Sequence, residues 1–143
     1  MDKTELRRTV IARRNALDLD VRAAKSAVVC ARLVELMESS GTAGQRTVAV
    51  YAAMDSEVDP AAFAAAAAAC GWRVAYPCML SASDAAACGQ RMCMRTVAAG
   101  DVSTAPFIAH PTRPFAATDI DSNRSDFVHA AVVCLSANRR GLR

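Results

Sequence analysis

One stretch, Thr47–Pro60 (TVAVYAAMDSEVDP), constrains the fold of this chain more than any other. Its apolar, β-branched start, Val48–Tyr51, favours a strand that is covered on both faces, as in a parallel sheet. An acidic turn follows. Asp59 and Pro60 are then typical of a helix start, because a carboxylate accepts orphan backbone N–H groups and proline suits the first helical position. The stretch therefore predicts a strand, a loop and a helix in succession.

The loop in this stretch is the first candidate for a ligand site. Ligands of open α/β sheets bind beyond the carboxyl ends of the strands, which here means Ala52–Glu57. The turn carries three carboxylates, from Asp55, Glu57 and Asp59. An acidic turn also keeps a strand–helix connection soluble, so the loop alone does not distinguish a binding site from a solvated connection.

The residues after the turn extend the pattern to a βαβ unit. Pro60–Cys70 is alanine-rich and ends at Gly71, a typical helix stop. Trp72–Tyr76 is a second strand candidate, which we expect Pro77 to close. Two strands that bracket one helix form a right-handed crossover with parallel strands. The fold class predicted is therefore α/β, with a mostly parallel sheet and flanking helices.

Two helices are predicted ahead of the sheet. The first spans Asp2–Leu17, where Asp2 and Glu5 have capping-box spacing. The second begins at Asp18 or Asp20 and runs to about Ser39. The 3.6-residue periodicity predicts these buried positions: Leu6, Val10 and Leu17 in the first helix, and Ala24, Val28, Ala31, Leu33, Leu36 and Met37 in the second.

The remainder of the chain alternates short apolar and polar segments. The segments expected are a loop at Ser81–Gln90, a strand at Met92–Val97, an irregular region at Pro106–Pro114, a polar region at Thr118–Ser125 and a buried strand at Val128–Leu135. With 143 residues, one domain is the expectation. We expect a single α/β domain over residues 1–143, with N-terminal helices in 2–39 and a sheet-forming part in 46–143.

Composition limits the classes of function. A net charge of +3 is compatible with an anionic ligand without requiring a nucleic acid. The sequence has no signal peptide and no apolar run of about 18 residues, so we expect a cytoplasmic protein with no membrane partner. Its cysteines form no C-x-x-C pair and are expected to be reduced and mostly buried. They are Cys30, Cys70, Cys78, Cys88, Cys93 and Cys134.

Three cations, Lys3, Arg7 and Arg14, lie on one flank of the apolar stripe of the first helix. They are suited to phosphate groups, and equally to a solvated rim. An RNA-binding surface built on Arg7, Arg8, Arg13 and Arg14 is another reading, but aromatic stacking residues are missing near these arginines. A zinc site at Cys88 and Cys93 would need His110 or His129 at spacings that known zinc sites do not use.

Several short motifs, taken in order, resemble the 5-formyltetrahydrofolate cyclo-ligase family (methenyltetrahydrofolate synthetases). They are K-x-x-L-R at Lys3–Arg7, R-N-A-L at Arg14–Leu17, V-Y-x-x-M-x-S-E-V-D at Val50–Asp59, G-x-R-V-x-x-P at Gly71–Pro77, M-x-M-R at Met92–Arg95, the segment Phe107–Pro111, and N-R-R-G-x-R at Asn138–Arg143. Order and spacing agree over the whole chain.

The resemblance implies a function and a set of residues. Members of this family use ATP and Mg²⁺ to convert 5-formyltetrahydrofolate to 5,10-methenyltetrahydrofolate. By resemblance, Lys3 and Arg7 bind ATP and the turn binds the folate. There Glu57 accepts hydrogen bonds from the pterin, Met54 forms a soft wall for its ring and Ala52 completes the contact. The resemblance assigns no catalytic residue and no magnesium ligand, and a monomer is favoured.

The sequence also departs from the family pattern. Ala52 is smaller than the usual aliphatic residue, Cys78 stands where a basic residue is common, and Asn138 replaces an aspartate. The chain ends at Arg143, before the glycine-rich L-G-x-G-x-G-Y-Y-D loop of the family, whose backbone N–H groups cradle phosphates. We therefore expect a family protein that is incomplete at its C-terminus, with weak or no ATP-dependent turnover. A non-catalytic folate-binding or regulatory protein of the same family is the alternative.

Overall fold

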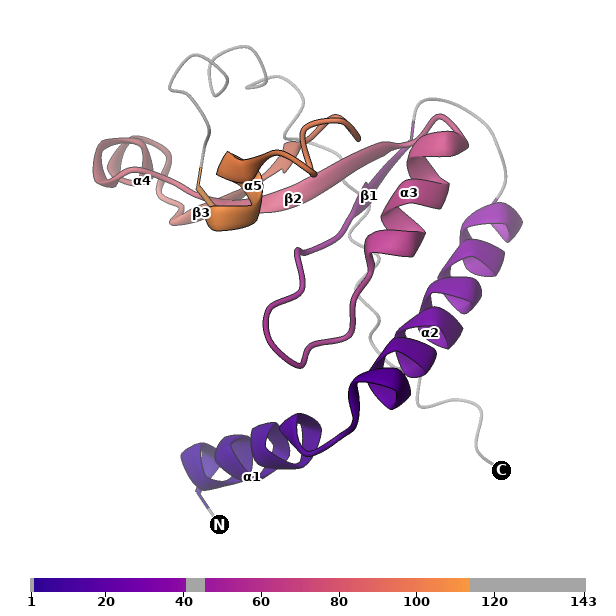
Figure 1. Ribbon diagram of the computed structural model, residues 1–143. Helices are drawn as coiled ribbons and strands as arrows, with labels where there is room; N and C mark the ends of the chain where they lie inside the picture. Colours follow the sequence, from indigo (N-terminus) through magenta and orange to yellow (C-terminus); the bar gives the residue numbers. More distant parts are fainter. Residues whose placement is uncertain (1, 41–45, 114–143) are drawn as a thin grey trace. The chain divides into compact units, whose positions relative to one another are not determined.

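The computed structural model describes residues 2–40 and 46–113 (Figure 1). In chain order its elements are α1 (Lys3–Asn15), α2 (Leu19–Ser39), β1 (Thr47–Ala49), α3 (Ala61–Ala69), β2 (Arg73–Met79), α4 (Ala82–Cys88), β3 (Met92–Thr96) and α5 (Ala105–Ala109). The predictions for Thr118–Ser125, Val128–Leu135 and Asn138–Arg143 lie outside the described residues.

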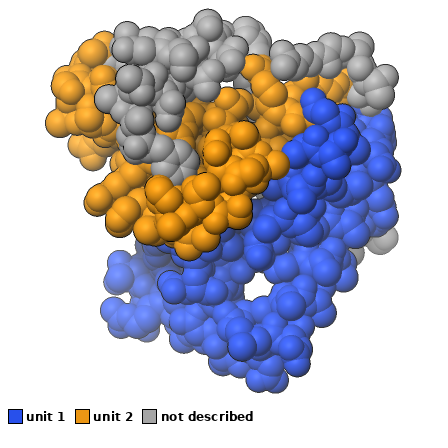
Figure 2. All heavy atoms as spheres, turned by 45° about the horizontal axis from the view of Figure 1, so that its top comes forward, with its two compact units in different colours: residues 1–44, 50–71 blue, residues 45–49, 72–143 orange. Residues whose placement is uncertain are grey.

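The chain divides into two compact units (Figure 2). Residues 1–44 and 50–71 form the first unit, which contains α1, α2, the acidic turn and α3. Residues 45–49 and 72–143 form the second, which contains the three strands, α4 and α5. The single domain expected over residues 1–143 stays a prediction.

The two N-terminal helices form where the capping residues predict them. Asp2 is the N-cap of α1, and its carboxylate accepts hydrogen bonds from the backbone N–H groups of Glu5, at 3.0 Å, and of Thr4. These two bonds lower the pKa of Asp2, with the Glu5 bond contributing most. Asp18 occupies the N-cap position of α2. Both helices are confirmed.

Most of the predicted buried positions of these helices are wrong, although Met37 in α2 is buried as expected. No residue of α1 is buried, and Leu6 and Val10 are 51% and 53% exposed. In α2 the buried residues are Ser26, Cys30 and Met37, whereas Val28 is 66% exposed. The sequence places apolar side chains on two sides of α2. The side that faces the turn is selected by two hydrogen bonds with the backbone of Asp59, whose N–H donates to Ser26 Oγ and whose carbonyl oxygen accepts from the Cys30 thiol.

The second unit contains a three-stranded mixed sheet of order β1-β2-β3. β1 pairs parallel with β2, with Val48 opposite Val74, and β2 pairs antiparallel with β3. Val48 and Val50 are buried as expected, but Tyr51 is exposed. The chain is therefore α/β as predicted. Its described sheet has one parallel and one antiparallel pair of strands.

The sequence predicted that Pro77 ends the second strand. This prediction is wrong, because Pro77 lies inside β2. Hydrogen bonds from Leu80 N to Arg91 O and from Val97 N to Val74 O, of 3.0 and 2.9 Å, mark two hydrogen-bonded residue pairs between β2 and β3. Because such pairs alternate with non-hydrogen-bonded ones in an antiparallel ladder, Pro77 and Met94 form a non-hydrogen-bonded pair. Toward β1, the pairing already ends at Ala75. The missing N–H of Pro77 therefore removes no bond from the ladder.

Two further predictions for this unit are corrected. Ser81–Gln90, expected as a loop, contains α4. Its N-cap Ser81 accepts a hydrogen bond from Asp84 N at 3.2 Å, and it ends at Gly89 with a φ of +70°. The irregular region expected at Pro106–Pro114 contains α5, whose Phe107 packs edge-on against Tyr76 with ring centroids 5.0 Å apart. These short helices depend on caps and on one aromatic contact rather than on apolar periodicity.

The described cysteines partly fit expectation, since Cys30 and Cys78 are buried, Cys93 is half-buried and Cys70 is exposed, all four without a disulfide. His110 is a surface residue, as its proline-rich surroundings indicated. Within residues 2–40 and 46–113, every helix is too short or too polar to cross a bilayer.

Replacing Phe107 by alanine should lower the free energy of unfolding by about 3–5 kcal/mol, the usual cost of truncating a buried phenylalanine. Phe107 is 3% exposed, and the change also removes the contact with Tyr76. Urea denaturation followed by circular dichroism measures the difference. The control is Ile108→Ala in the next position, which is 68% exposed and should change stability by less than about 0.5 kcal/mol. Equal losses in the two variants would show that α5 does not pack as described.

Candidate functional site

The acidic turn is closed by reciprocal hydrogen bonds between Met54 and Glu57. Glu57 N donates to Met54 O at 3.1 Å, and Met54 N donates to the Glu57 Oε2 carboxylate oxygen at 3.2 Å. Between them, Asp55 has a φ of +53°. Aspartate is one of the few non-glycine residues that adopt this left-handed conformation readily. The turn therefore restrains both the backbone and the Glu57 side chain.

Ser56 attaches the turn to the end of α1. Its side chain is buried, accepts a hydrogen bond from Arg14 Nε at 3.0 Å and donates one to Asn15 Oδ1. Arg14, one of the cations on the flank of the first helix, thus has a structural partner in the turn.

Asp59 attaches the other end of the turn to α2 and starts α3. Asp59 N donates to Ser26 Oγ at 3.0 Å, and the Cys30 thiol donates to Asp59 O at 3.4 Å. The Asp59 carboxylate accepts a hydrogen bond from Ala61 N at 2.9 Å. The Asp59 carboxylate therefore accepts a backbone N–H group at the helix start, as predicted. The predicted place of Pro60 at the first helical position is wrong, because Pro60 is the N-cap and α3 begins at Ala61.

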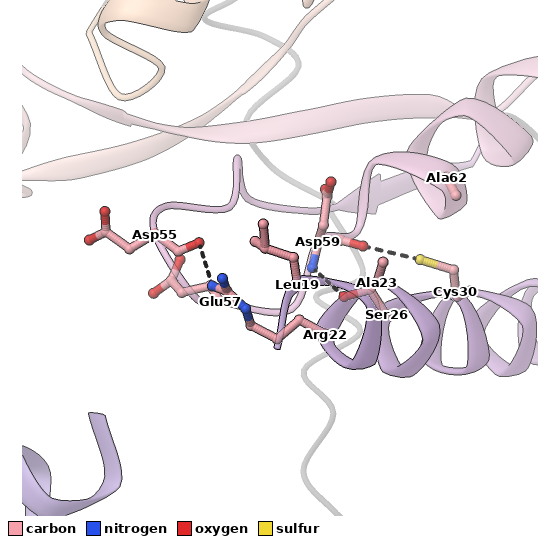
Figure 3. Close-up of a pocket in the computed structure, with 10 residues that line it drawn as sticks. Leu19, Arg22, Ala23, Ser26, Cys30, Asp55, Glu57, Asp59 and Ala62 are labelled. Carbon is pink, nitrogen blue, oxygen red and sulfur yellow. Dashed lines mark hydrogen bonds between the residues drawn. The ribbon is translucent and has the colours of Figure 1, made fainter. Parts of the chain in front are cut away.

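A pocket of about 310 Å³ lies between this turn and α2 (Figure 3). Arg22, Ser26 and Cys30 line it from α2, and Ala62 lines it from α3. The turn contributes Asp55, Glu57 and Asp59. All of these residues belong to the first unit.

The polar groups of the pocket are mostly acceptors. Three acidic residues and one basic residue, Arg22, line the pocket, and Arg22 Nη1 donates to the backbone oxygen of Asp55 at 3.4 Å. Arg22 Nε is buried and has no hydrogen-bond partner within the described ranges. Ionised carboxylates are the strongest acceptors for N–H groups. The pocket is thus suited to a ligand that presents several N–H donors.

Tyr51 reports on the charge of the turn. Its hydroxyl donates to Val58 O at 2.9 Å. Partial burial raises the pKa of Tyr51 above its ordinary value, and the negative charges of Glu57 and Asp59 raise it further. The pKa of Tyr51 is therefore sensitive to the charges of the carboxylates beside the pocket.

The structure brings only one of the predicted site residues into this pocket. Glu57 is half-buried and lines it. Ala52, half-buried, and Met54, exposed, belong to the same turn but are not lining residues. Lys3 and Arg7 are exposed in the first two turns of α1 and do not line the pocket either. Their assignment to ATP stays a prediction.

The sequence analysis missed the contribution of α2. Arg22, Ser26 and Cys30 are spaced four residues apart and therefore lie on one face of the helix. A stripe of one basic and two small polar side chains was a readable signal, but the periodicity of the larger apolar residues masked it.

Comparisons with protein-family models, curated proteins and solved structures found no match for this chain. Among the residues described, no three His, Cys, Asp or Glu side chains gather where they could hold a metal ion.

Replacing Ser56 by alanine should lower the free energy of unfolding by about 1–3 kcal/mol, because Arg14 Nε and Asn15 Oδ1 each lose a partner in a part-buried place. Urea denaturation gives the difference. As a control, Ser103→Ala removes one exposed hydrogen bond to Gly100 O and should cost less than about 0.5 kcal/mol. Indistinguishable variants would mean that Ser56 does not anchor the turn.

The raised pKa of Tyr51 predicts a loss of stability in alkali. The folded protein holds this proton more tightly than the unfolded chain, so its contribution is complete below pH 10.0 and disappears as the pH rises through the folded pKa. Titration of tyrosinate absorbance should show a high-pH transition that Tyr51→Phe removes. Glu57→Gln should move this transition to lower pH, and Glu38→Gln, on the exposed end of α2, should leave it in place. An unchanged transition pH in Glu57→Gln would contradict the proximity of the Glu57 carboxylate to the Tyr51 hydroxyl.

Proposed function

We propose that this chain acts in folate one-carbon metabolism as a 5-formyltetrahydrofolate cyclo-ligase. The reaction is the ATP-dependent conversion of 5-formyltetrahydrofolate to 5,10-methenyltetrahydrofolate. The series of short motifs supports the family, and one structural observation carries the site. This observation is the half-buried carboxylate of Glu57 in the wall of an acceptor-rich pocket.

Glu57 has the chemistry needed to bind the pterin. A pterin presents an amino group and an adjacent ring N–H, and a carboxylate can accept both with its two oxygens. Oε2 already accepts one bond from Met54 N, which orients the group and leaves further lone pairs on both oxygens. Met54 lies exposed in the same turn and offers a polarisable thioether surface to a ring.

The nucleotide is assigned to α1. Lys3 and Arg7 are one helical turn apart on an exposed face, so both cations can point to the same phosphate group. When bound, ATP supplies the phosphoryl group that activates the formyl oxygen, and Mg²⁺ balances its charge. Lys3 and Arg7 would bind and orient the triphosphate. No residue is assigned to the metal.

A non-catalytic folate-binding or regulatory protein is the second candidate. One observation favours it: the pocket and its carboxylates are assembled by α2, α3 and the turn, without Lys3 or Arg7. A folate affinity that does not change when ATP is added would support this candidate.

Calorimetric titration of the chain with 5-formyltetrahydrofolate tests the role of Glu57. Glu57→Gln keeps the shape and an acceptor for Met54 N but removes the charge. We expect affinity to fall about tenfold or more, because hydrogen bonds to charged groups contribute about 1.5–3 kcal/mol. Glu38→Gln, outside the pocket, is the matched control and should bind as the unmodified chain does. Equal affinities of the two variants would remove Glu57 from the site.

Repeating the titration with ATP and Mg²⁺ separates the two candidates. Tighter folate binding, together with growth of the methenyltetrahydrofolate absorbance, supports the cyclo-ligase. In that case Lys3→Gln and Arg7→Gln should each weaken the effect of ATP without changing folate binding alone. Folate binding without any response to ATP supports the non-catalytic candidate, and absence of folate binding contradicts both.

A further inference from the structure

The hairpin of β2 and β3 holds two cysteines directly opposite each other. Cys78 and Cys93 are partners in the antiparallel register, and both are reduced. They belong to the hydrogen-bonded set of pairs, in which the two Cα atoms are about 5.5 Å apart, within the range that a disulfide requires. The Cys93 thiol also donates to Cys78 O at 3.7 Å. Little movement therefore separates the two thiols from a covalent bond.

The surroundings give the two thiols different roles. Cys78 is buried, and burial raises the pKa of its thiol against the smaller opposing effects of the Arg95 charge and of a hydrogen bond with Cys93. Cys93 is half-buried and thus more open to a reagent. Because opposite residues share a face of the sheet, Arg95 and Tyr76, two positions away, lie on the same face as the thiols. Arg95 is buried there and favours thiolate over thiol.

We propose that Cys78 and Cys93 are a redox-active pair, a reversible disulfide site that cross-links β2 to β3. The oxidant is a low-molecular-weight disulfide of the glutathione class. The Cys93 thiolate attacks one sulfur of that disulfide and releases one small thiolate, which takes up a proton. The Cys78 thiolate then attacks the Cys93 sulfur and releases the second small thiol. Two protein thiols are oxidised and one small disulfide is reduced to two thiols.

The disulfide would act on the hairpin alone. It closes a loop that contains α4, and α5 packs through Phe107 on Tyr76, on the same face of the sheet as the bond. Arg22, Glu57, Lys3 and Arg7 belong to the other unit, so the inference does not depend on the proposed function.

The test incubates the full chain in mixtures of oxidised and reduced glutathione, quenches with acid, and maps the products by mass spectrometry. Trypsin cleaves after Arg91 and places Cys78 and Cys93 on separate peptides. The expected product is the intact chain lighter by two hydrogens, with these two peptides linked. Cys88 shares a peptide with Cys78, so Cys88→Ser must retain the link. A link to Cys30, Cys70, Cys88 or Cys134 instead, or a lasting glutathione adduct on Cys93, would overturn the proposal.

Variants separate the two roles. Cys93→Ser should abolish the intramolecular bond, and Cys78→Ser should leave a stable glutathione adduct on Cys93. Cys70→Ser, at an exposed position, should behave like the unmodified chain. Circular dichroism checks the fold of each variant, and if buried Cys78→Ser does not fold, the peptide map and Cys93→Ser decide. Cys93→Ser that still forms the same lightened chain would contradict the assignment.

Discussion

The helical unit depends on how the acidic turn is attached to its neighbours. Ser56 bonds to Arg14 and Asn15 at the end of α1, and the backbone of Asp59 bonds to Ser26 and Cys30 of α2. These are polar contacts between segments about 30 to 40 residues apart in the chain. Such part-buried hydrogen bonds add little net stability, but they favour one arrangement of the segments, because any other arrangement would leave a polar group without a partner. They determine which face of α2 meets the turn, and thereby which side chains line the pocket.

This dependence explains the composition of the pocket. A turn held at both ends presents its carboxylates from a restrained backbone, and the Met54–Glu57 bonds orient one of them further. The Arg22 guanidinium contacts the backbone of the same turn and offsets part of the charge. A site of this kind is suited to a ligand with N–H donors, and this supports the proposal that Glu57 binds a pterin.

The β2–β3 hairpin follows a different principle, because the alternation of the ladder decides where unusual residues can stand. Pro77 occupies a position at which its nitrogen faces no strand within residues 2–40 and 46–113. The next residue, Cys78, therefore falls in a hydrogen-bonded pair opposite Cys93. The register of β2 and β3 therefore both allows Pro77 within the strand and places Cys78 opposite Cys93.

The sequence by itself determined the elements whose signals are local. Asp2 and Asp18 are the N-caps of α1 and α2, and the Asp59 carboxylate accepts a hydrogen bond from Ala61 N at the start of α3. Gly71 follows the end of α3, and β1, β2 and β3 form at β-branched or alternating runs, because caps, glycine and side-chain alternation act within a few residues. The loop that carries Glu57 was a candidate site because it follows a strand, and the family resemblance then singled out Glu57, which lines the pocket. Only the tertiary structure decided the buried face of α2, the antiparallel direction of β3, the passage of β2 through Pro77 and the presence of Arg22 in the pocket. Each depends on a partner distant in sequence, and apolar periodicity carries no information about which partner a face will meet.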